Sequence, residues 1–228
     1  MNSTEFSFDT IRNFDEHINN SIPNYDLLQD AILSISEFIT MPDTTVIDLG
    51  CSTGKLLKRM KHSGRKVGID WSKNLLPLSN LTLFGDDPAQ EPEFYEQDIV
   101  TADLRQWGSP SLVTSIFTLQ FIPKEYRLQV LRGIRQSLLD DGVFIWAEKV
   151  VCESGWQQEL TTFSYYDYKK RSFSAEEIMQ KEQDLRQLMR CNTSEENQEL
   201  ARKAGFYQSQ LLWKFFNFEC WLYKKGSK

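Results

Sequence analysis

The chain has 228 residues, 40% of them hydrophobic, and a formal net charge of −6. This size and apolar content support one sizeable core, so we predict a single domain over residues 1–228. The negative charge disfavours stable nucleic-acid binding, because phosphate backbones attract basic surfaces, and no apolar run reaches the roughly 20 residues that span a membrane.

Helix and strand patterns alternate along the chain. An N-terminal helical cap is expected over residues 1–42, with an amphipathic helix at 25–40. The elements predicted after it are strands at 46–49, 66–70, 94–99, 112–118 and 143–148, with helices starting at Lys55 and spanning 124–139. Such alternation predicts an α/β protein with a parallel sheet and right-handed crossovers.

The last third of the chain breaks this alternation. A helical insertion is predicted over residues 150–204, with a long helical section at 175–204. After Gly205-Phe206, strands at 209–218 and 219–224 are joined by so short a link that they must pair antiparallel. A mostly parallel sheet that ends in an antiparallel hairpin resembles the Rossmann-like class I methyltransferase fold and differs from the NAD-binding fold.

The segment from Val46 to Gly54 predicts a strand, a tight turn and the start of a helix. NAD is disfavoured, because only Gly50 and Gly54 are present and the Gly-x-Gly-x-x-Gly pattern is incomplete. The turn also matches the Gly-x-Ser-x-Gly nucleophile elbow of hydrolases. That enzyme class needs a histidine later in the chain. The two histidines, His17 and His62, lie before the turn and only ten residues after Ser52, so neither is placed to serve as the base.

A nucleoside without a phosphate, with S-adenosylmethionine (SAM) as the common case, fits the acids that follow. Asp70 ends the second predicted strand twenty residues after Gly50, where it can accept both ribose hydroxyls. Trp71 can lie along an adenine, and Asp98 is placed to accept from the adenine amino group. The alternative is that Asp70 and Asp98 only cap the helices after them. The set of strand-end acids favours ligand binding.

The four cysteines are irregularly spaced and form no Cys-x-x-Cys pair. This spacing predicts no metal site and no disulfide framework, and it fits a reducing compartment. Residues 1–6 have neither the basic region nor the apolar core of a secretory signal. We therefore expect a cytoplasmic protein.

Seven short stretches, in order over nearly the whole chain, carry a family pattern. They are Asn20-Ser21-Ile22-Pro23-Asn24-Tyr25, Asp48-Leu49-Gly50-Cys51-Ser52, Phe117-Thr118-Leu119-Gln120-Phe121, Glu148-Lys149, Glu177-Ile178-Met179-Gln180-Lys181, Lys203-Ala204-Gly205-Phe206 and Phe216-Asn217-Phe218. In these stretches the chain resembles the carboxy-S-adenosylmethionine synthase family. Those enzymes prepare a carboxylated SAM, from SAM and prephenate, for wobble-uridine modification of transfer RNA.

The resemblance implies a set of cofactor-binding residues. Tyr25 would close over the cofactor, although a tyrosine at a helix start can also pack on the core. Asp48 belongs to the motif at the end of the first strand. The turn after it, Gly50, Cys51 and Ser52, would line the methionine portion of SAM. The remaining implied contacts are Asp70 with Trp71 at the ribose and adenine, and Asp98 with Ile99 at the adenine.

Two positions depart from the family pattern. Ile116 stands where the family has a cofactor-pocket asparagine, and Glu182 stands where it has an arginine that pairs with the extra carboxylate. An arginine holds a carboxylate through charge-assisted hydrogen bonds, whereas a glutamate there would repel it. We therefore predict a preference for ordinary SAM. The alternative is that Lys181, Arg186 or Arg171 takes the place of the family's arginine.

Methyl transfer to a small-molecule acceptor is the predicted reaction. Carboxy-SAM synthesis is the first alternative, and a non-catalytic SAM-binding or interaction module is the second. Glu148, at the end of the fifth strand, is the candidate base if the acceptor must lose a proton. The aromatic residues of 156–168 either wall an acceptor pocket or pack on the sheet or a second subunit, which leaves a homodimer open. Lys169-Lys170-Arg171 is expected to be a solvated charge run.

Overall fold

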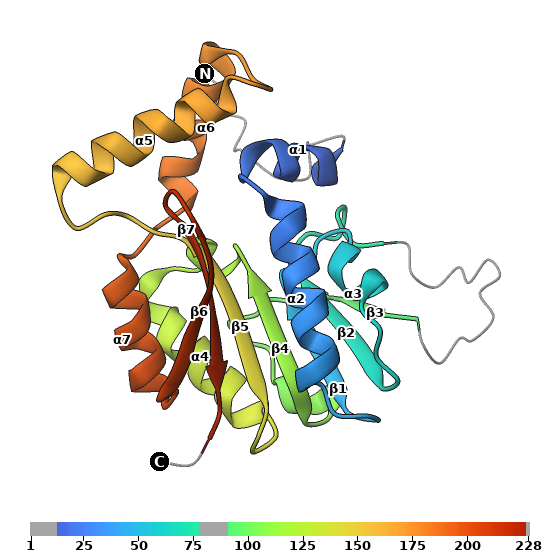
Figure 1. Cartoon of the computed structure of the whole chain (residues 1–228). Helices are drawn as coiled ribbons and strands as arrows, with labels where there is room; N and C mark the ends of the chain where they lie inside the picture. Colours follow the sequence, from blue (N-terminus) through green and yellow to red (C-terminus); the bar gives the residue numbers. More distant parts are fainter. Residues whose placement is uncertain (1–12, 78–90, 227–228) are drawn as a thin grey trace.

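Seven strands form one sheet in the order β3-β2-β1-β4-β5-β7-β6 (Figure 1). The computed structural model describes residues 13–77 and 91–226. The strands are β1 (Thr45–Leu49), β2 (Arg65–Asp70), β3 (Glu93–Glu96), β4 (Pro110–Ile116), β5 (Val143–Lys149), β6 (Gln208–Phe215) and β7 (Phe218–Lys224). Strands β1 to β5 run parallel, whereas β7 is antiparallel to both β5 and β6. The mostly parallel sheet and its C-terminal hairpin are as predicted.

The central strands read as near-continuous apolar runs because helices cover both of their faces. All five residues of β1 are buried. Side chains alternate between the faces, so Ile47 and Leu49 join one core cluster while Val46 joins the other. Asp48 shares the face of Val46. This alternation decides which strand-end side chains can reach a ligand.

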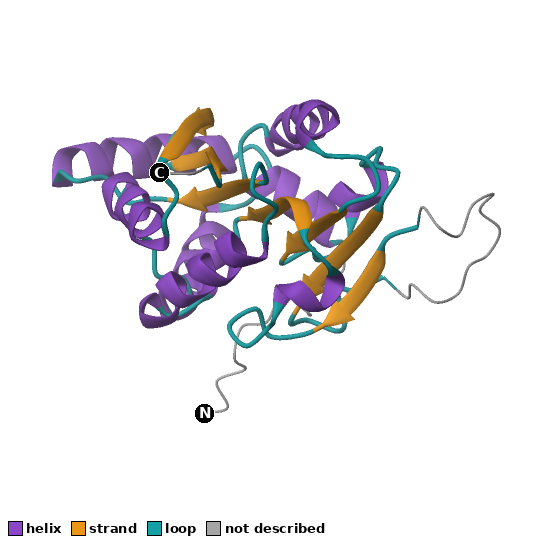
Figure 2. Cartoon of the chain, turned by 90° about the horizontal axis from the view of Figure 1, so that it is seen from below, coloured by secondary structure: helices purple, strands orange, loops and turns teal. Residues whose placement is uncertain are grey.

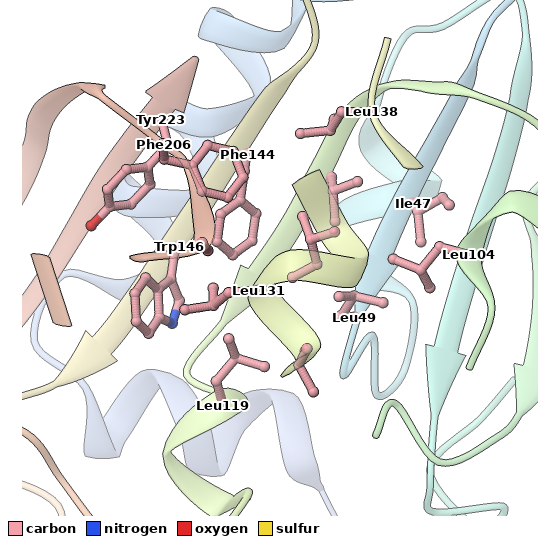
Figure 3. Packing of buried hydrophobic residues seen from close by; sticks show 14 of the residues in the cluster. Ile47, Leu49, Leu104, Leu119, Leu131, Leu138, Phe144, Trp146, Phe206 and Tyr223 are labelled. Carbon is pink, nitrogen blue, oxygen red and sulfur yellow. The ribbon is translucent and has the colours of Figure 1, made fainter. Parts of the chain in front are cut away.

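Helices α4 (Lys124–Ser137) and α7 (Ser194–Ala204), with the 3-10 turn η3 (Leu104–Trp107), cover one face of the sheet. Figure 3 shows the rings of Phe144, Phe206 and Tyr223 gathered beside Trp146 in this layer. The ring centroid of Phe144 lies 5.8 Å from that of Phe206 and 6.0 Å from that of Tyr223.

Helices α2 (Tyr25–Ile39) and α3 (Lys55–Arg59) cover the opposite face, where Leu28, Ile32 and Leu57 are fully buried. Figure 2 shows helices on both sides of the strands. Helices α1 (Phe14–Ser21), α5 (Gly155–Lys169) and α6 (Ala175–Leu188) stand beyond the carboxyl edge of the parallel strands (Figure 1). They form a cap over that edge. The first twelve residues of the predicted N-terminal cap lie outside the described residues.

The structure divides the predicted helical section of residues 175–204 into α6 and α7. The N-cap Thr193 accepts a hydrogen bond from the Glu196 N–H, and Glu196 Oε2 accepts one from the Thr193 N–H at 2.9 Å. This capping box starts a new helix. The signal Thr193-x-x-Glu196 was present in the sequence and was missed. As a result α7 packs on α4, away from the cap.

Three strands also end earlier than predicted. Strand β3 ends at Glu96, so Asp98 lies in the loop after it, and β4 ends at Ile116. The hairpin turns at Phe216-Asn217, between β6 and β7, and the φ of Phe216 is +48°.

Within residues 13–77 and 91–226, no helix combines the length and the apolar content that crossing a membrane requires.

Candidate functional site

A cavity of about 870 Å³ opens at the carboxyl edge of the parallel strands, beneath the cap. All ten predicted cofactor residues line it: Tyr25, Asp48, Gly50, Cys51, Ser52, Asp70, Trp71, Asp98, Ile99 and Ile116. They come from α2 and from the ends of β1, β2, β3 and β4, which the parallel topology brings to one edge. Trp71 keeps 75% of its surface exposed, so its ring stands at the rim.

The turn after β1 is fixed by two glycines. Gly50 has φ +75°, and a Cβ there would lie 2.1 Å from Thr118 Oγ1. Gly54 has φ +71°, and its Cβ would lie 2.3 Å from the ring of Phe94. Glycine is therefore required at both positions, because a side chain would overlap Thr118 of the loop after β4 or Phe94 of β3 and because the backbone is left-handed.

Asp70 and Asp98 both cap local loops, and both line the cavity. Asp70 Oδ1 accepts a hydrogen bond from the Ser72 N–H at 2.8 Å, and Oδ2 accepts one from the Ser52 N–H at 2.9 Å. Asp98 Oδ1 accepts from the Val100 N–H at 2.9 Å. Each carboxylate thus caps its loop. A carboxylate has about four acceptor sites, and both carboxylates line the cavity.

Asp48 is the most deeply buried acid of the cavity, with 4% of its surface exposed. Thr114 Oγ1 donates a hydrogen bond to its Oδ1 at 2.6 Å. Burial raises the pKa of Asp48 to about 7, and the nearby charge of Asp70 adds to the rise. Across the cavity, Tyr25 accepts a hydrogen bond from Gln29 Nε2 at 3.0 Å. Burial, followed by the charge of Asp48, raises the pKa of the Tyr25 hydroxyl.

The Phe-Thr-Leu-Gln-Phe stretch forms the loop after β4 and its 3-10 turn η4 (Leu119–Phe121). Phe117 has φ +57° and its ring lies against that of Tyr25, with centroids 6.3 Å apart. Gln120 Oε1 accepts a hydrogen bond from the Lys149 N–H at 2.8 Å, which ties the loop to the end of β5. Phe117 and Gln120 both line the cavity.

Arg127 holds two cavity walls together, and sequence reasoning missed it. Its side chain is fully buried beneath the loop. Its Nε donates to the Ile122 carbonyl at 2.8 Å, and its Nη2 donates to the Gln120 and Arg190 carbonyls at 3.1 and 2.6 Å. The loop after β4 and the segment after α6 therefore share one guanidinium.

Glu148 does not line the cavity, which argues against its predicted role as a base. The strand extends one residue further than predicted, to Lys149. Alternation then places Lys149 on the cavity face and Glu148 with Phe144 and Trp146 on the α4 face. Glu148 is 3% exposed, and burial raises its pKa to about 8.

The aromatic segment of α5 also splits between two environments. Tyr165 is buried and lines the cavity, and its hydroxyl donates to the Ser21 carbonyl at 2.8 Å. Trp156 and Phe163 remain 70% and 65% exposed on the outer side. Only one of the predicted wall residues therefore reaches the cavity.

The structure corrects the prediction that Lys169 belongs to a solvated charge run. Its side chain is 4% exposed and lines the cavity, together with Lys149, Lys181 and His17. Burial lowers the pKa of Lys169. Burial and the charge of Lys169 lower the pKa of Lys181 to about 8, and burial with both lysine charges lowers that of His17 to about 4.

Glu182 takes a different position from the one expected. It does not line the cavity, and its Oε1 lies 3.9 Å from the Nζ of both Lys149 and Lys169. Both lysines line the cavity, whereas Glu182 does not. Glu182 is therefore not placed to repel the extra carboxylate of a carboxylated cofactor at short range, as the sequence analysis expected. The preference for ordinary SAM stays a prediction.

Comparisons with known proteins agree with this architecture. A family model described as a methyltransferase domain matches residues 46–142. The chain is 31% identical over 214 residues to the carboxy-S-adenosyl-L-methionine synthase of Staphylococcus epidermidis, with 92% of this chain and 91% of that protein covered. It is 31% identical over 223 residues to the enzyme of that name from Pseudomonas aeruginosa, with 93% and 89% covered.

Solved structures share the fold at low sequence identity. Human N-acetylserotonin methyltransferase, solved in complex with SAM, superposes with a TM-score of 0.60 at 16% identity over 89% of this chain. A pyocyanin biosynthetic protein superposes with a TM-score of 0.55 at 15% identity over 85% of this chain. The chain spans about half the length of these two proteins, 53% and 54%.

Proposed function

The chain belongs to the carboxy-S-adenosyl-L-methionine synthase family, which has the class I methyltransferase fold. Because Ile116 and Glu182 depart from the family pattern, we propose that this chain transfers the methyl group of SAM to a small-molecule acceptor. One observation carries the proposal: the acids at the ends of β1, β2 and β3 face one cavity of suitable size. The runner-up among nucleotide cofactors, NAD, needs a glycine pattern that the turn lacks.

The polar groups that line the cavity fit SAM. Asp70 and Asp98 present carboxylate acceptors to the hydroxyl and amino groups of a nucleoside. Asp48 offers a negative charge to a cationic ligand, and Ser52 Oγ is buried with no hydrogen-bond partner among the described residues. When bound, SAM supplies an activated methyl group whose departure leaves a neutral thioether. The chain's own contribution is to align the acceptor and exclude water.

Carboxy-SAM synthesis from SAM and prephenate is the second candidate, and one observation favours it. Lys149, Lys169 and Lys181 line the cavity although the family's arginine is replaced by Glu182. Ile116 argues in the other direction, because it brings an apolar side chain to the cavity where the family has an asparagine. Ordinary methyl transfer remains the first proposal.

Product analysis separates the two candidates. The protein is incubated with SAM and a small-molecule extract, and in a parallel sample with SAM and prephenate, and the nucleosides are identified by mass spectrometry. We expect S-adenosylhomocysteine in the first sample and no carboxylated SAM in the second. Carboxylated SAM from the unmodified protein would establish the second candidate, and binding of SAM without either product would favour a binding module.

For partners we propose small molecules, in line with the net charge of −6. A cytoplasmic location and a homodimer, with the exposed side of α5 as one contact, remain proposals.

A further inference from the structure

A second cavity, of about 560 Å³, lies between the loop after β3 and helix α4. We call it the α4 cavity; its lining comes from residues 99–105 and 129–136. Ligand pockets in proteins span about 300 to 1,000 Å³, so this volume suits a small molecule. Ile99, Val100 and Thr101 line both the α4 cavity and the cofactor cavity. This loop is therefore a wall that the two cavities share.

One face of α4 forms the opposite wall. Its lining residues include Gln129, Arg132, Gly133 and Gln136, whose spacing of i, i+3, i+4 and i+7 places them on the same side of the helix. A Cβ added to Gly133 would meet no atom within 4 Å. Glycine is the least favourable residue of a helix interior apart from proline. Here its missing side chain leaves the middle of the α4 cavity open.

The chemistry of this lining favours an organic anion. The floor is apolar, because it consists of buried core residues: Leu104, Val130 and Ile134. At the rim, Asp103 neutralises Arg105, which donates to its two carboxylate oxygens at 2.9 and 3.0 Å. Arg132 is exposed and has no hydrogen-bond or ion-pair partner among the described residues. The described lining thus joins an apolar floor to one guanidinium whose charge is not offset.

The shared loop connects this cavity with a proposed cofactor contact. The Val100 N–H donates to Asp98 Oδ1 at 2.9 Å, and the Val100 carbonyl accepts from Gln129 Nε2 at 3.3 Å. Asp98 lines the cofactor cavity, whereas Gln129 lines the α4 cavity. A molecule that packs on Val100 and Thr101 from the α4 side would hold the loop in the arrangement that positions Asp98.

We propose that the α4 cavity is an effector site for a small organic acid, whose carboxylate pairs with Arg132 while its apolar chain packs on the floor, and that its occupation strengthens SAM binding through the shared loop. The effector takes no part in methyl transfer. Coupling between two binding sites is reciprocal, so SAM strengthens effector binding by the same factor. Because the coupling passes through one loop, we expect a factor near the lower end of the usual range, about fivefold.

The probes are hexanoate and its uncharged analogue hexanamide. Each is titrated into the isotope-labelled full-length protein, and the backbone amide NMR signals are followed. We expect hexanoate to move the signals of residues 99–105 and 129–136. Hexanamide should bind at least about fivefold more weakly, because it cannot form a charge-assisted pair with Arg132. Calorimetric titration of SAM with and without saturating hexanoate then measures the coupling.

Two variants, each with a matched control, locate the binding. Gly133→Phe should fill the α4 cavity and abolish the hexanoate shifts in residues 129–136. Its control is Gly155→Phe, because an added Cβ at Gly155 also meets nothing within 4 Å and this residue does not line the cavity. Arg132→Met should weaken hexanoate about fivefold. Lys124→Met removes an exposed charge of the same helix outside the cavity and should leave hexanoate binding unchanged.

Hexanoate shifts that spare residues 129–136, or equal hexanoate binding by Gly133→Phe and the unmodified protein, would overturn the effector site. Equal affinity for hexanoate and hexanamide would overturn the role of Arg132. A SAM affinity that saturating hexanoate leaves unchanged would overturn the coupling. The hexanoate titrations need neither SAM nor turnover, so they decide the site even if the proposed methyl transfer fails its own test.

Discussion

Thr114 Oγ1 donates a 2.6 Å hydrogen bond to Asp48, and both side chains are buried between β1 and β4. The bond favours the charged form of Asp48, but burial outweighs it and raises the pKa to about 7 from its ordinary 3.8. A bound cation would draw Asp48 back to its charged form. Cofactor affinity and protonation are therefore linked at this residue.

We predict that SAM binds more weakly as the pH falls below about 7, by up to about tenfold per pH unit, because Asp48 must lose its proton. Calorimetry across about pH 5.5 to 8.5 measures the dependence. Asp48→Asn should weaken binding and flatten the profile. Thr114→Val should move the midpoint upward, since it removes a hydrogen bond that lowers the pKa. An affinity that is constant over this range would contradict the assignment.

The same shift predicts the stability of the ligand-free protein. A raised pKa means that the folded state keeps a proton that the unfolded chain releases, so this contribution to the free energy of unfolding is lost as the pH rises from about 4 through 7. Glu148, with a pKa of about 8, should act in the same sense at higher pH. Chemical denaturation at about pH 8.5 should show Glu148→Gln to be more stable than the unmodified protein, with its affinity for SAM unchanged.

Weaker SAM binding by Glu148→Gln would instead show that Glu148 contributes to the SAM site. Asp48→Asn provides the comparison, because it should gain stability at the same pH and lose SAM affinity.

Gly50→Ala should destabilise the protein by about 2 kcal/mol or more, since a left-handed residue with a Cβ is strained and that Cβ would overlap Thr118. Gly133→Ala is the matched control. Gly133 is an exposed position within α4, and an added Cβ there meets nothing within 4 Å. Alanine should stabilise that helix by about 1 kcal/mol. Equal unfolding midpoints of the two variants would show that the turn is not constrained as described.

Arg127→Met should loosen both cavity walls. It leaves the carbonyls of Ile122, Gln120 and Arg190 without their buried donor, which should cost about 3 kcal/mol or more of stability. Amide hydrogen exchange should accelerate in residues 119–122 and 189–191, and SAM affinity should fall. Arg132→Met, an exposed position of the same helix, is the control. Unchanged exchange in both segments would exclude the proposed positioning role.

The sheet and the acidic part of the site could be predicted because their signals are local. Asp48 and Asp70 stand at the ends of apolar runs, and parallel topology brings such ends together. The basic part could not be predicted in the same way. Lys169 sits in a charged triplet that is typical of a solvent-facing helix end, and only the packing of α5 against the cavity buries it. Whether Lys149 or Glu148 faces the cavity depends on which face of the sheet each alternate residue of β5 covers, and in an apolar run buried on both faces the sequence does not show this.

Asp70 caps its loop, and an aspartate can do so without binding a ligand. The claim that Asp70 binds SAM therefore needs a capping aspartate as its control. Asp103 makes the same kind of contact at an exposed position: its Oδ1 accepts a hydrogen bond from the Arg105 N–H two residues on, at 3.1 Å. It does not line the cofactor cavity. Comparing the two aspartates therefore separates ligand binding from loop stability.

The most direct test of the account is calorimetric titration of SAM, and of NAD, into the unmodified protein, Asp70→Ala and Asp103→Ala. We predict that the unmodified protein and Asp103→Ala bind SAM alike and that neither binds NAD. Asp70→Ala should lose about 100-fold in SAM affinity, because two charge-assisted hydrogen bonds are removed. Tight NAD binding, or equal SAM affinity in Asp70→Ala and Asp103→Ala, would contradict the assignment of the strand-end acids to SAM.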